Sequence, residues 1–137
     1  MYKHIIVAVD GSDNSLRAME DAIKIASAGS QIEVLYIAST EHIASKILEA
    51  GTLDEFNAES RKRVAREEEV LKVSGIPYKV IIEHGEPGKT IAKFVNDSKA
   101  DLVVIGCRGL TSMQEMVFGS VSSYVMKNVD CSCLLVK

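Results

Sequence analysis

The sequence lacks any apolar run approaching the ~18 consecutive residues of a membrane-spanning helix. Its first residues enter an expected strand without the pattern of a signal peptide. Cysteines are also few, and because the three present are an odd number, a disulfide framework is not expected. We therefore expect a cytoplasmic protein in a reducing compartment.

An excess of positive charge is missing as well. The 16 Lys and Arg residues stand against 19 Asp and Glu, and the formal net charge of −3 gives no electrostatic basis for binding nucleic acid. One basic cluster, residues 61–63, is close in the chain to Glu59 and to the glutamates at 67–69. This mixture predicts a solvent-exposed, ion-paired helix face.

Internal repeats, linkers and low-complexity segments do not occur in the sequence. The 137 residues, of which 47% are hydrophobic and 26% charged, are typical of one globular domain, which we expect to cover residues 1–137.

Short apolar runs rich in β-branched residues predict five buried strands. They cover residues 4–9, 32–38, 78–82, 101–105 and 133–136. Apolar residues at helical spacing predict helices between these runs. The expected helices run from a cap at Ser12 or Asp13 to Gly29, over 53–73, from Pro87 onward, and from at or near Gly119. Residues 41–54 are less regular and suggest a short helix that Gly51 interrupts.

Strands that alternate with helices in this way predict an α/β fold. We expect a single-domain, three-layer sandwich with a five-stranded parallel sheet in the order 3-2-1-4-5 and helices on both faces. In such sheets the ligand lies beyond the carboxyl ends of the strands, where the winding reverses direction. Asp10 after the first strand and Gly106 after the fourth are expected to meet there.

The segment from Ile105 to Ser122 is the most distinctive part of the sequence. Its glycines have the spacing Gly-x2-Gly-x9-Gly-Ser, at positions 106, 109 and 119. Glycine allows the backbone to approach a ligand closely, and the unpaired N–H groups of a new helix attract phosphate. The spacing is neither a Rossmann fingerprint nor a Walker A loop. It favours a phosphate-binding loop, although a simple strand-to-helix connection would also accommodate three glycines.

This glycine spacing resembles that of the nucleotide-binding branch of the universal stress protein family. The opening Ile5 to Ser12 and the sequence Gly85-Glu86-Pro87 followed by Ile91 are also similar to family patterns. The resemblance implies ATP as the ligand, with Mg²⁺ or Mn²⁺ as its counterion. Two departures are Cys107, where a serine is expected, and Ser132, where proline is common.

Carried over position by position, the resemblance implies two groups of binding residues. The adenine and ribose would lie against Ala8, Val9, Asp10 and Ile37. The phosphates would lie against Ile105, Gly106, Arg108, Gly109, Gly119, Ser120, Val121 and Ser122. The chemistry of the side chains agrees, because Asp10 can accept ribose hydroxyls or help to hold a metal ion and Arg108 can pair with phosphate.

The resemblance further implies a homodimer formed through the last strand, acting as a nucleotide-dependent stress-response module. An enzyme is not expected, because neither a clear general base nor paired carboxylates occur at catalytic spacing, so hydrolysis of ATP would at most be slow. The alternatives are a slow ATPase, tested at Asp10 and Glu115, and a nucleotide-independent interaction protein of the same fold. Thiol chemistry at Cys131 and Cys133 is a third alternative, against which a buried structural role is the commoner outcome.

Overall fold

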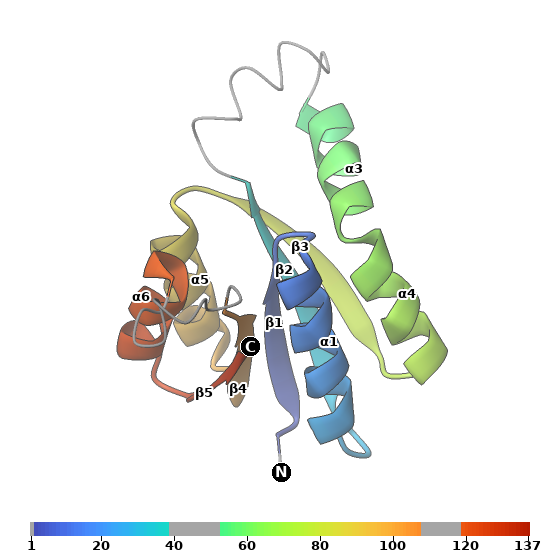
Figure 1. Cartoon of the computed structure of the whole chain (residues 1–137), viewed down its shortest axis with the longest axis vertical. Helices are drawn as coiled ribbons and strands as arrows, with labels where there is room; N and C mark the ends of the chain where they lie inside the picture. The colour runs from blue at the N-terminus through green and yellow to red at the C-terminus, as the bar shows by residue number, and fades with distance from the viewer. Residues whose placement is uncertain (1, 39–52, 108–118) are drawn as a thin grey trace.

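The computed structural model describes residues 2–38, 53–107 and 119–137 of the chain. In this part the protein has one parallel sheet with the strand order β3-β2-β1-β4-β5, covered by helices on both faces (Figure 1). The strands are β1 (His4–Val9), β2 (Gln31–Ala38), β3 (Tyr78–His84), β4 (Leu102–Gly106) and β5 (Ser132–Val136). The predicted three-layer α/β architecture and its strand order are therefore confirmed.

The helices divide between the two faces of the sheet (Figure 1). The described helices are α1 (Asp13–Ile25), α3 (Leu53–Arg63), α4 (Ala65–Ser74), α5 (Pro87–Ser98) and α6 (Ser120–Asn128). Helices α1, α3 and α4 lie on one face, whereas α5 and α6 lie on the other. None of these helices is long and apolar enough to cross a membrane. The short helix expected within residues 41–54 falls almost entirely outside the described residues.

Strand β1 is the centre of both hydrophobic cores. Ile5 and Val7 pack into the core under α1 and α4, while Ile6 and Ala8 pack into the core under α5 and α6. Because both faces are buried, consecutive residues of β1 must all be apolar, which explains the continuous run in the sequence.

Two helix boundaries differ from the sequence prediction. The single helix expected over 53–73 is broken at Val64, whose backbone (φ −105°, ψ 17°) leaves the helical region and separates α3 from α4. At this break the carbonyl of Arg63 lies against Gly11, while Val64 and Leu71 both enter the core beside α1. Helix α1 ends at Ile25 and not at Gly29, because Ala26 is extended and the Ser27 N–H donates to the Ser30 hydroxyl.

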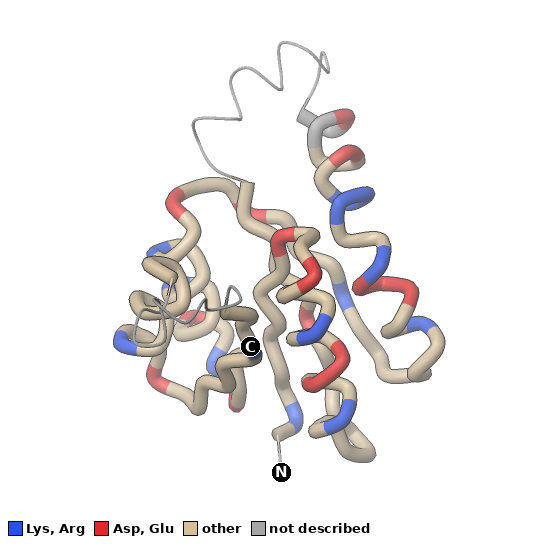
Figure 2. The backbone as a smooth tube through the Cα atoms, viewed as in Figure 1, with Lys and Arg blue, Asp and Glu red and all other residues tan. Residues whose placement is uncertain are grey.

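Charged residues of both signs occur along α3 and α4 (Figure 2), and one ion pair there is well formed. Arg61 donates to both carboxylate oxygens of Glu68, at 2.9 and 3.3 Å, and the Tyr78 hydroxyl donates to the second oxygen at 2.7 Å. These interactions tie α3, α4 and β3 together. The hydrogen bond from Arg61 lowers the pKa of Glu68 below its ordinary value, and the bond to Glu68 raises the pKa of Tyr78.

The lowered pKa of Glu68 predicts a pH-dependent contribution to stability. The ion pair stabilises the fold above the unfolded pKa of about 4.5 and loses this effect as the pH falls through the folded value. We expect Glu68→Gln to lower the free energy of unfolding near neutral pH by about 1 kcal/mol. Urea denaturation of both proteins from about pH 7 to pH 3 should show this difference shrinking in acid. A difference that stays constant over this range would contradict the assignment.

Candidate functional site

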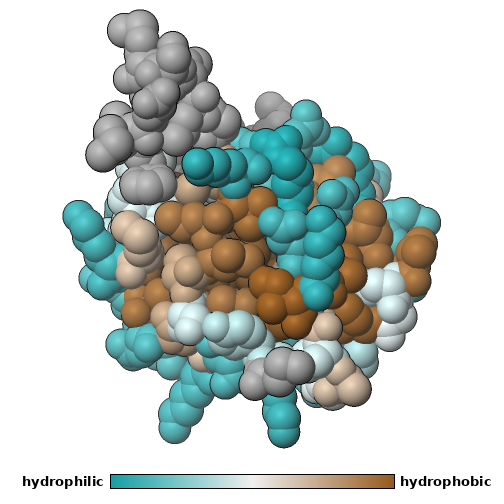
Figure 3. Space-filling model, turned by 60° about the horizontal axis from the view of Figure 1, so that its bottom comes forward, coloured by the Kyte–Doolittle hydropathy of each residue, from teal (hydrophilic) through white to brown (hydrophobic). Residues whose placement is uncertain are grey.

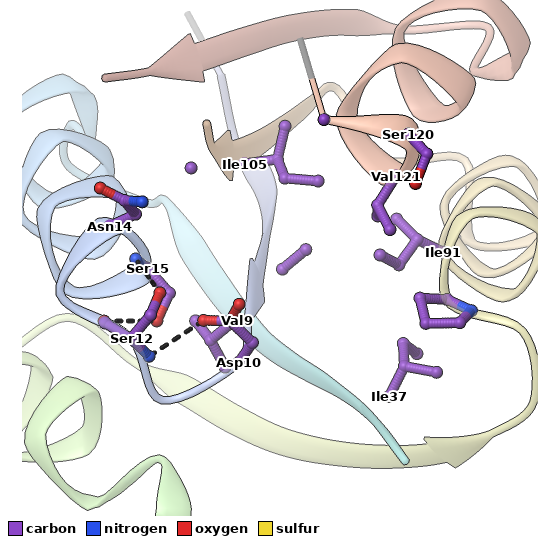
Figure 4. A pocket seen from close by; sticks show the side chains of 14 residues that line it. Val9, Asp10, Ser12, Asn14, Ser15, Ile37, Ile91, Ile105, Ser120 and Val121 are labelled. Carbon is purple, nitrogen blue, oxygen red and sulfur yellow. Dashed lines mark hydrogen bonds between the residues drawn. The ribbon is translucent and has the colours of Figure 1, made fainter. Parts of the chain in front are cut away.

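A cavity of about 410 Å³ opens at the carboxyl end of the sheet (Figure 4). It lies where β1 and β4 run side by side, with Ala8 opposite Ile105 in the register. The chain leaves β1 for α1 on one face of the sheet and reaches α6 after β4 on the other. The cavity therefore occupies the point at which the winding of the sheet reverses, where ligands of such folds bind.

Most of the residues expected at the site line this cavity. From the sheet these are Ala8, Val9, Asp10, Ile37, Ile105 and Gly106. From the start of α6 they are Gly119, Ser120 and Val121. The convergence of Asp10 and Gly106, which the sequence predicted from strand order, is confirmed. Arg108 and Gly109, also expected at the site, lie outside the described residues.

Five further lining residues were not expected from the sequence. They are Ser12, Asn14, Ser15, Pro87 and Ile91. All five lie at or near the first turn of α1 or α5, the helices that follow β1 and β3. The signal was available, because the rule that ligands bind at the carboxyl ends of strands applies equally to the helix starts that follow them.

The α1 wall of the cavity is polar. Asp10 is exposed, and its Oδ1 accepts the backbone N–H of Ser12 at 2.9 Å. The Ser12 hydroxyl accepts the backbone N–H of Ser15 at 3.2 Å and so forms the N-cap of α1, as the sequence predicted. These bonds fix the loop between β1 and α1 in a single shape.

The opposite wall is largely apolar. Ile37 from β2, Ile91 from α5 and Val121 from α6 lie across the cavity from the polar residues of α1 (Figure 4). Pro87 at the start of α5 completes this wall. The cavity therefore suits a flat apolar group on one side and hydrogen-bonding groups on the other.

The start of α6 supplies hydrogen-bond donors. Gly119 is the N-cap and has no side chain to cap the helix, so the first N–H groups of α6 are free of intrahelical partners. These groups and the helix dipole favour an anion. Ser122 lies beside the cavity without lining it, because its side chain is buried and its hydroxyl donates to the Gly119 carbonyl at 3.0 Å.

The two described glycines of the motif, Gly106 and Gly119, differ in how closely other atoms surround them. A Cβ atom on Gly106 would lie 2.7 Å from the carbonyl oxygen of Asn14, so α1 can pack here only against glycine. Among the described residues, a Cβ atom on Gly119 would meet only the Ser122 hydroxyl, at 3.6 Å, and its φ of −61° suits any residue. Packing within the described residues thus explains Gly106, whereas Gly119 has only the preference of an N-cap for glycine as its structural reason.

The described residues give little support for a metal site or for thiol chemistry. Within them, no group of three or more His, Cys, Asp or Glu side chains is arranged to hold a metal ion, and Asp10 is the one carboxylate lining the cavity. Cys131 and Cys133 pack against the core under α5 and α6. Burial raises the pKa of Cys133 to about 11 and also raises the pKa of Cys131. Both are therefore thiols near neutral pH, which disfavours a redox role.

Comparison with known proteins gives a consistent result. The model of the universal stress protein family matches residues 1–137. A universal stress protein of Methanocaldococcus jannaschii is 31% identical over 144 residues, covering 100% of this chain and 83% of the relative. A hypothetical protein whose biochemical function was assigned from its structure aligns with a TM-score of 0.82 and 25% identity, covering 100% and 96% of the two chains. A universal stress protein solved in complex with cAMP aligns with a TM-score of 0.72 and 27% identity, covering 99% and 97%.

The different surroundings of Gly106 and Gly119 can be tested by measuring the free energy of unfolding. We expect Gly106→Ala to lower the free energy of unfolding by about 1–3 kcal/mol, because the new methyl group overlaps the Asn14 carbonyl. Gly119→Ser is the matched control, because it also adds a Cβ atom but keeps a good N-cap residue, and it should leave stability within about 0.5 kcal/mol of wild type. Denaturation with urea measures both. Equal stability of the two variants would show that α1 does not depend on the close approach at Gly106.

Proposed function

The chain belongs to the universal stress protein family, and from this premise we propose that its cavity binds an adenine nucleotide, with ATP as the expected ligand. In this proposal the base lies against the apolar wall formed by Ile37, Ile91 and Val121. The sugar lies on the α1 side near Asp10, and the phosphates meet the start of α6.

The observation that carries the proposal is Gly119. It lines the cavity at the N-terminus of a helix, and the described residues leave room for a side chain there. A ligand that approaches the helix start closely adds a reason for glycine to its preference as an N-cap, and phosphate is the group that such a helix start favours.

The comparison with solved relatives supports an adenine nucleotide in particular. The universal stress protein that was solved with cAMP is 27% identical to this chain and shares its fold. We extend the ligand class, and not cAMP itself, to this protein. The choice of ATP rests on the glycine spacing of residues 106–119, of which the structure describes both ends.

A divalent ion would accompany ATP in this proposal. Mg²⁺ is commonly held by one or two carboxylates together with the phosphates of the nucleotide, so the single carboxylate of Asp10 fits a jointly formed site. Nucleotide occupancy would then alter the surface that the protein presents to its partners. We propose on this basis a cytoplasmic, nucleotide-dependent regulatory module.

The first test is nucleotide binding by wild type and by Gly119→Val. Wild-type protein should bind Mg·ATP in calorimetric titration, and small molecules released on denaturation should include an adenine nucleotide by mass spectrometry. We expect Gly119→Val to weaken ATP binding by roughly tenfold or more, because its side chain occupies the approach to the helix start.

The control for this variant is its own stability. Gly119→Val should remain folded and unfold only a few degrees below wild type, since no atom of the described residues within 3.4 Å opposes a Cβ there and the change loses a favourable N-cap residue. Unchanged ATP affinity in the folded variant would remove Gly119 from the site. Absence of nucleotide binding by wild type would overturn the proposed function.

We also propose that the protein forms a homodimer through β5. This strand is at the edge of the sheet, and among the described strands it pairs with β4 alone. Its Cys133, Leu134 and Leu135 are each only half-buried. One face of the molecule shows hydrophobic side chains at its centre and hydrophilic ones around them (Figure 3). An uncovered edge strand with apolar side chains favours pairing with a second copy.

A proline can block the open edge of β5 without removing a hydrogen bond between β5 and β4. The Val136 carbonyl accepts from Cys107 on the β4 side, so, by the alternation along a strand, the N–H of Leu135 points to the open edge. We expect Leu135→Pro to be monomeric in sedimentation at concentrations where wild type is dimeric. Leu134→Pro is the contrasting control, because it removes a donor facing β4 and should lower stability. A Leu135→Pro protein that sediments as wild type does would exclude pairing through this edge.

A further inference from the structure

One buried acidic side chain, that of Glu67, contacts a residue of the cavity wall from the protein interior. Glu67 on α4 is fully buried, and its Oε1 accepts the hydroxyl of Ser15 at 2.9 Å. Within the described residues its other oxygen, Oε2, has no hydrogen-bond partner. A buried carboxylate with an unsatisfied oxygen lowers stability relative to an apolar side chain of similar volume. Its contribution to this protein should therefore be sought in what it does to Ser15.

The segment that carries Glu67 is held firmly against the loop that forms the α1 wall. Arg66 donates to Oδ1 of Asp13 at 2.9 Å and to the carbonyl of Gly11 at 3.1 Å. Gly11 itself approaches the carbonyl of Arg63 so closely that a Cβ atom would lie 2.8 Å from its oxygen. Residues 63–67 thus lie directly behind the loop, and from this position Glu67 reaches Ser15.

The hydrogen bond between Ser15 and Glu67 determines whether the hydrogen or the oxygen of the Ser15 hydroxyl faces the cavity. Serine has one O–H to donate, and the two acceptors within reach are Oε1 of Glu67 at 2.9 Å and the carbonyl of Ser12 at 3.0 Å. Both acceptors belong to the protein, so the proton is directed away from the cavity. Ser15 lines the cavity with 3% of its surface exposed (Figure 4), so a lone pair of its oxygen is the part of the hydroxyl that remains for a ligand.

The α1 wall therefore offers two acceptors, the Asp10 carboxylate and the Ser15 oxygen, beside the donors of Ser12 and Asn14. A donor of the ligand can satisfy either acceptor. In an adenine nucleotide with ionised phosphates, the hydroxyl groups of the ribose are the donors on the sugar. We propose that Glu67 is a positioning residue, which holds the Ser15 hydroxyl so that its oxygen accepts a hydrogen bond from a ribose hydroxyl. This inference rests on the proposed function and makes the sugar a determinant of specificity.

The test compares ATP with 2′-deoxy-ATP and 3′-deoxy-ATP by calorimetric titration. Wild type should bind one of the two deoxy analogues about fivefold or more weakly than ATP, which corresponds to the loss of one hydrogen bond. Ser15→Ala should bind ATP more weakly and lose this discrimination, whereas Glu67→Met should lose part of it, because the Ser12 carbonyl at 3.0 Å remains an acceptor for the Ser15 hydroxyl. The double variant should be no worse than Ser15→Ala alone, because Glu67 acts only through Ser15.

Stability separates this role from a purely structural one. We expect Glu67→Met to unfold at the same temperature as wild type or higher, since it removes a buried carboxylate, while its discrimination between sugars is reduced. Glu67→Gln retains an oxygen that can accept from Ser15 and should restore the discrimination. Glu68→Gln is the matched control on the same helix, because Glu68 contacts Arg61 and Tyr78 and not the cavity. It should lower stability and leave the ratio of affinities unchanged.

Each outcome has a distinct meaning. If wild type binds ATP and Glu67→Met discriminates between the sugars as wild type does, the positioning role is wrong and the proposed function stands. If wild type binds ATP and both deoxy analogues equally, the assignment of Ser15 to a ribose hydroxyl is wrong. If wild type binds none of the three nucleotides, the proposed function fails, and this inference fails with it.

Discussion

The parallel pairing of β1 with β4 is the constraint on which the rest of the structure depends. It joins the two halves of the chain, and every residue of β1 from Ile5 to Val9 is buried because helices cover both faces. The same pairing brings the ends of the two strands together, with α1 departing on one face and α6 arriving on the other. A cavity between two helix starts follows from this topology, whatever ligand the side chains then select.

The loop between β1 and α1 is held from two sides by backbone contacts that only glycine permits. On the sheet side, Gly106 approaches the carbonyl of Asn14, and on the helix side Gly11 approaches the carbonyl of Arg63. A loop fixed in this way can present Asp10 and Ser15 to a ligand without losing conformational entropy on binding. The break at Val64 contributes to the same end, because it places the carbonyl of Arg63 against the loop.

The fold could be predicted from the sequence because its signals are local. Continuous apolar runs indicated the strands, and the alternation of strands and helices indicated a parallel sheet covered on both faces, for which the expected order 3-2-1-4-5 is the one observed. The location of the site followed from that order. The break at Val64 could not be predicted, because no Gly or Pro marks it and the contact that accompanies it, with Gly11, is far away in the sequence. Ser15 and Ile91 were recognisable as helix residues, but their place on a cavity wall depends on how the helices sit on the sheet.

Glu67 illustrates the limit of pattern reasoning most clearly. In the sequence it is one of three consecutive glutamates near a basic cluster, and such a run is typical of a solvated helix face. In the structure Glu68 pairs with Arg61 as such a run suggests, but it is buried, and Glu67 is fully buried and faces Ser15, so the expected solvent exposure is wrong for both. Adjacent residues of a helix point about 100° apart, so one run of like charges necessarily spans different environments. Glu67 is therefore the residue whose burial stability explains least, and the run of like charges hides it in the sequence. Its contact with Ser15 on the cavity wall is the reason that we propose for its burial.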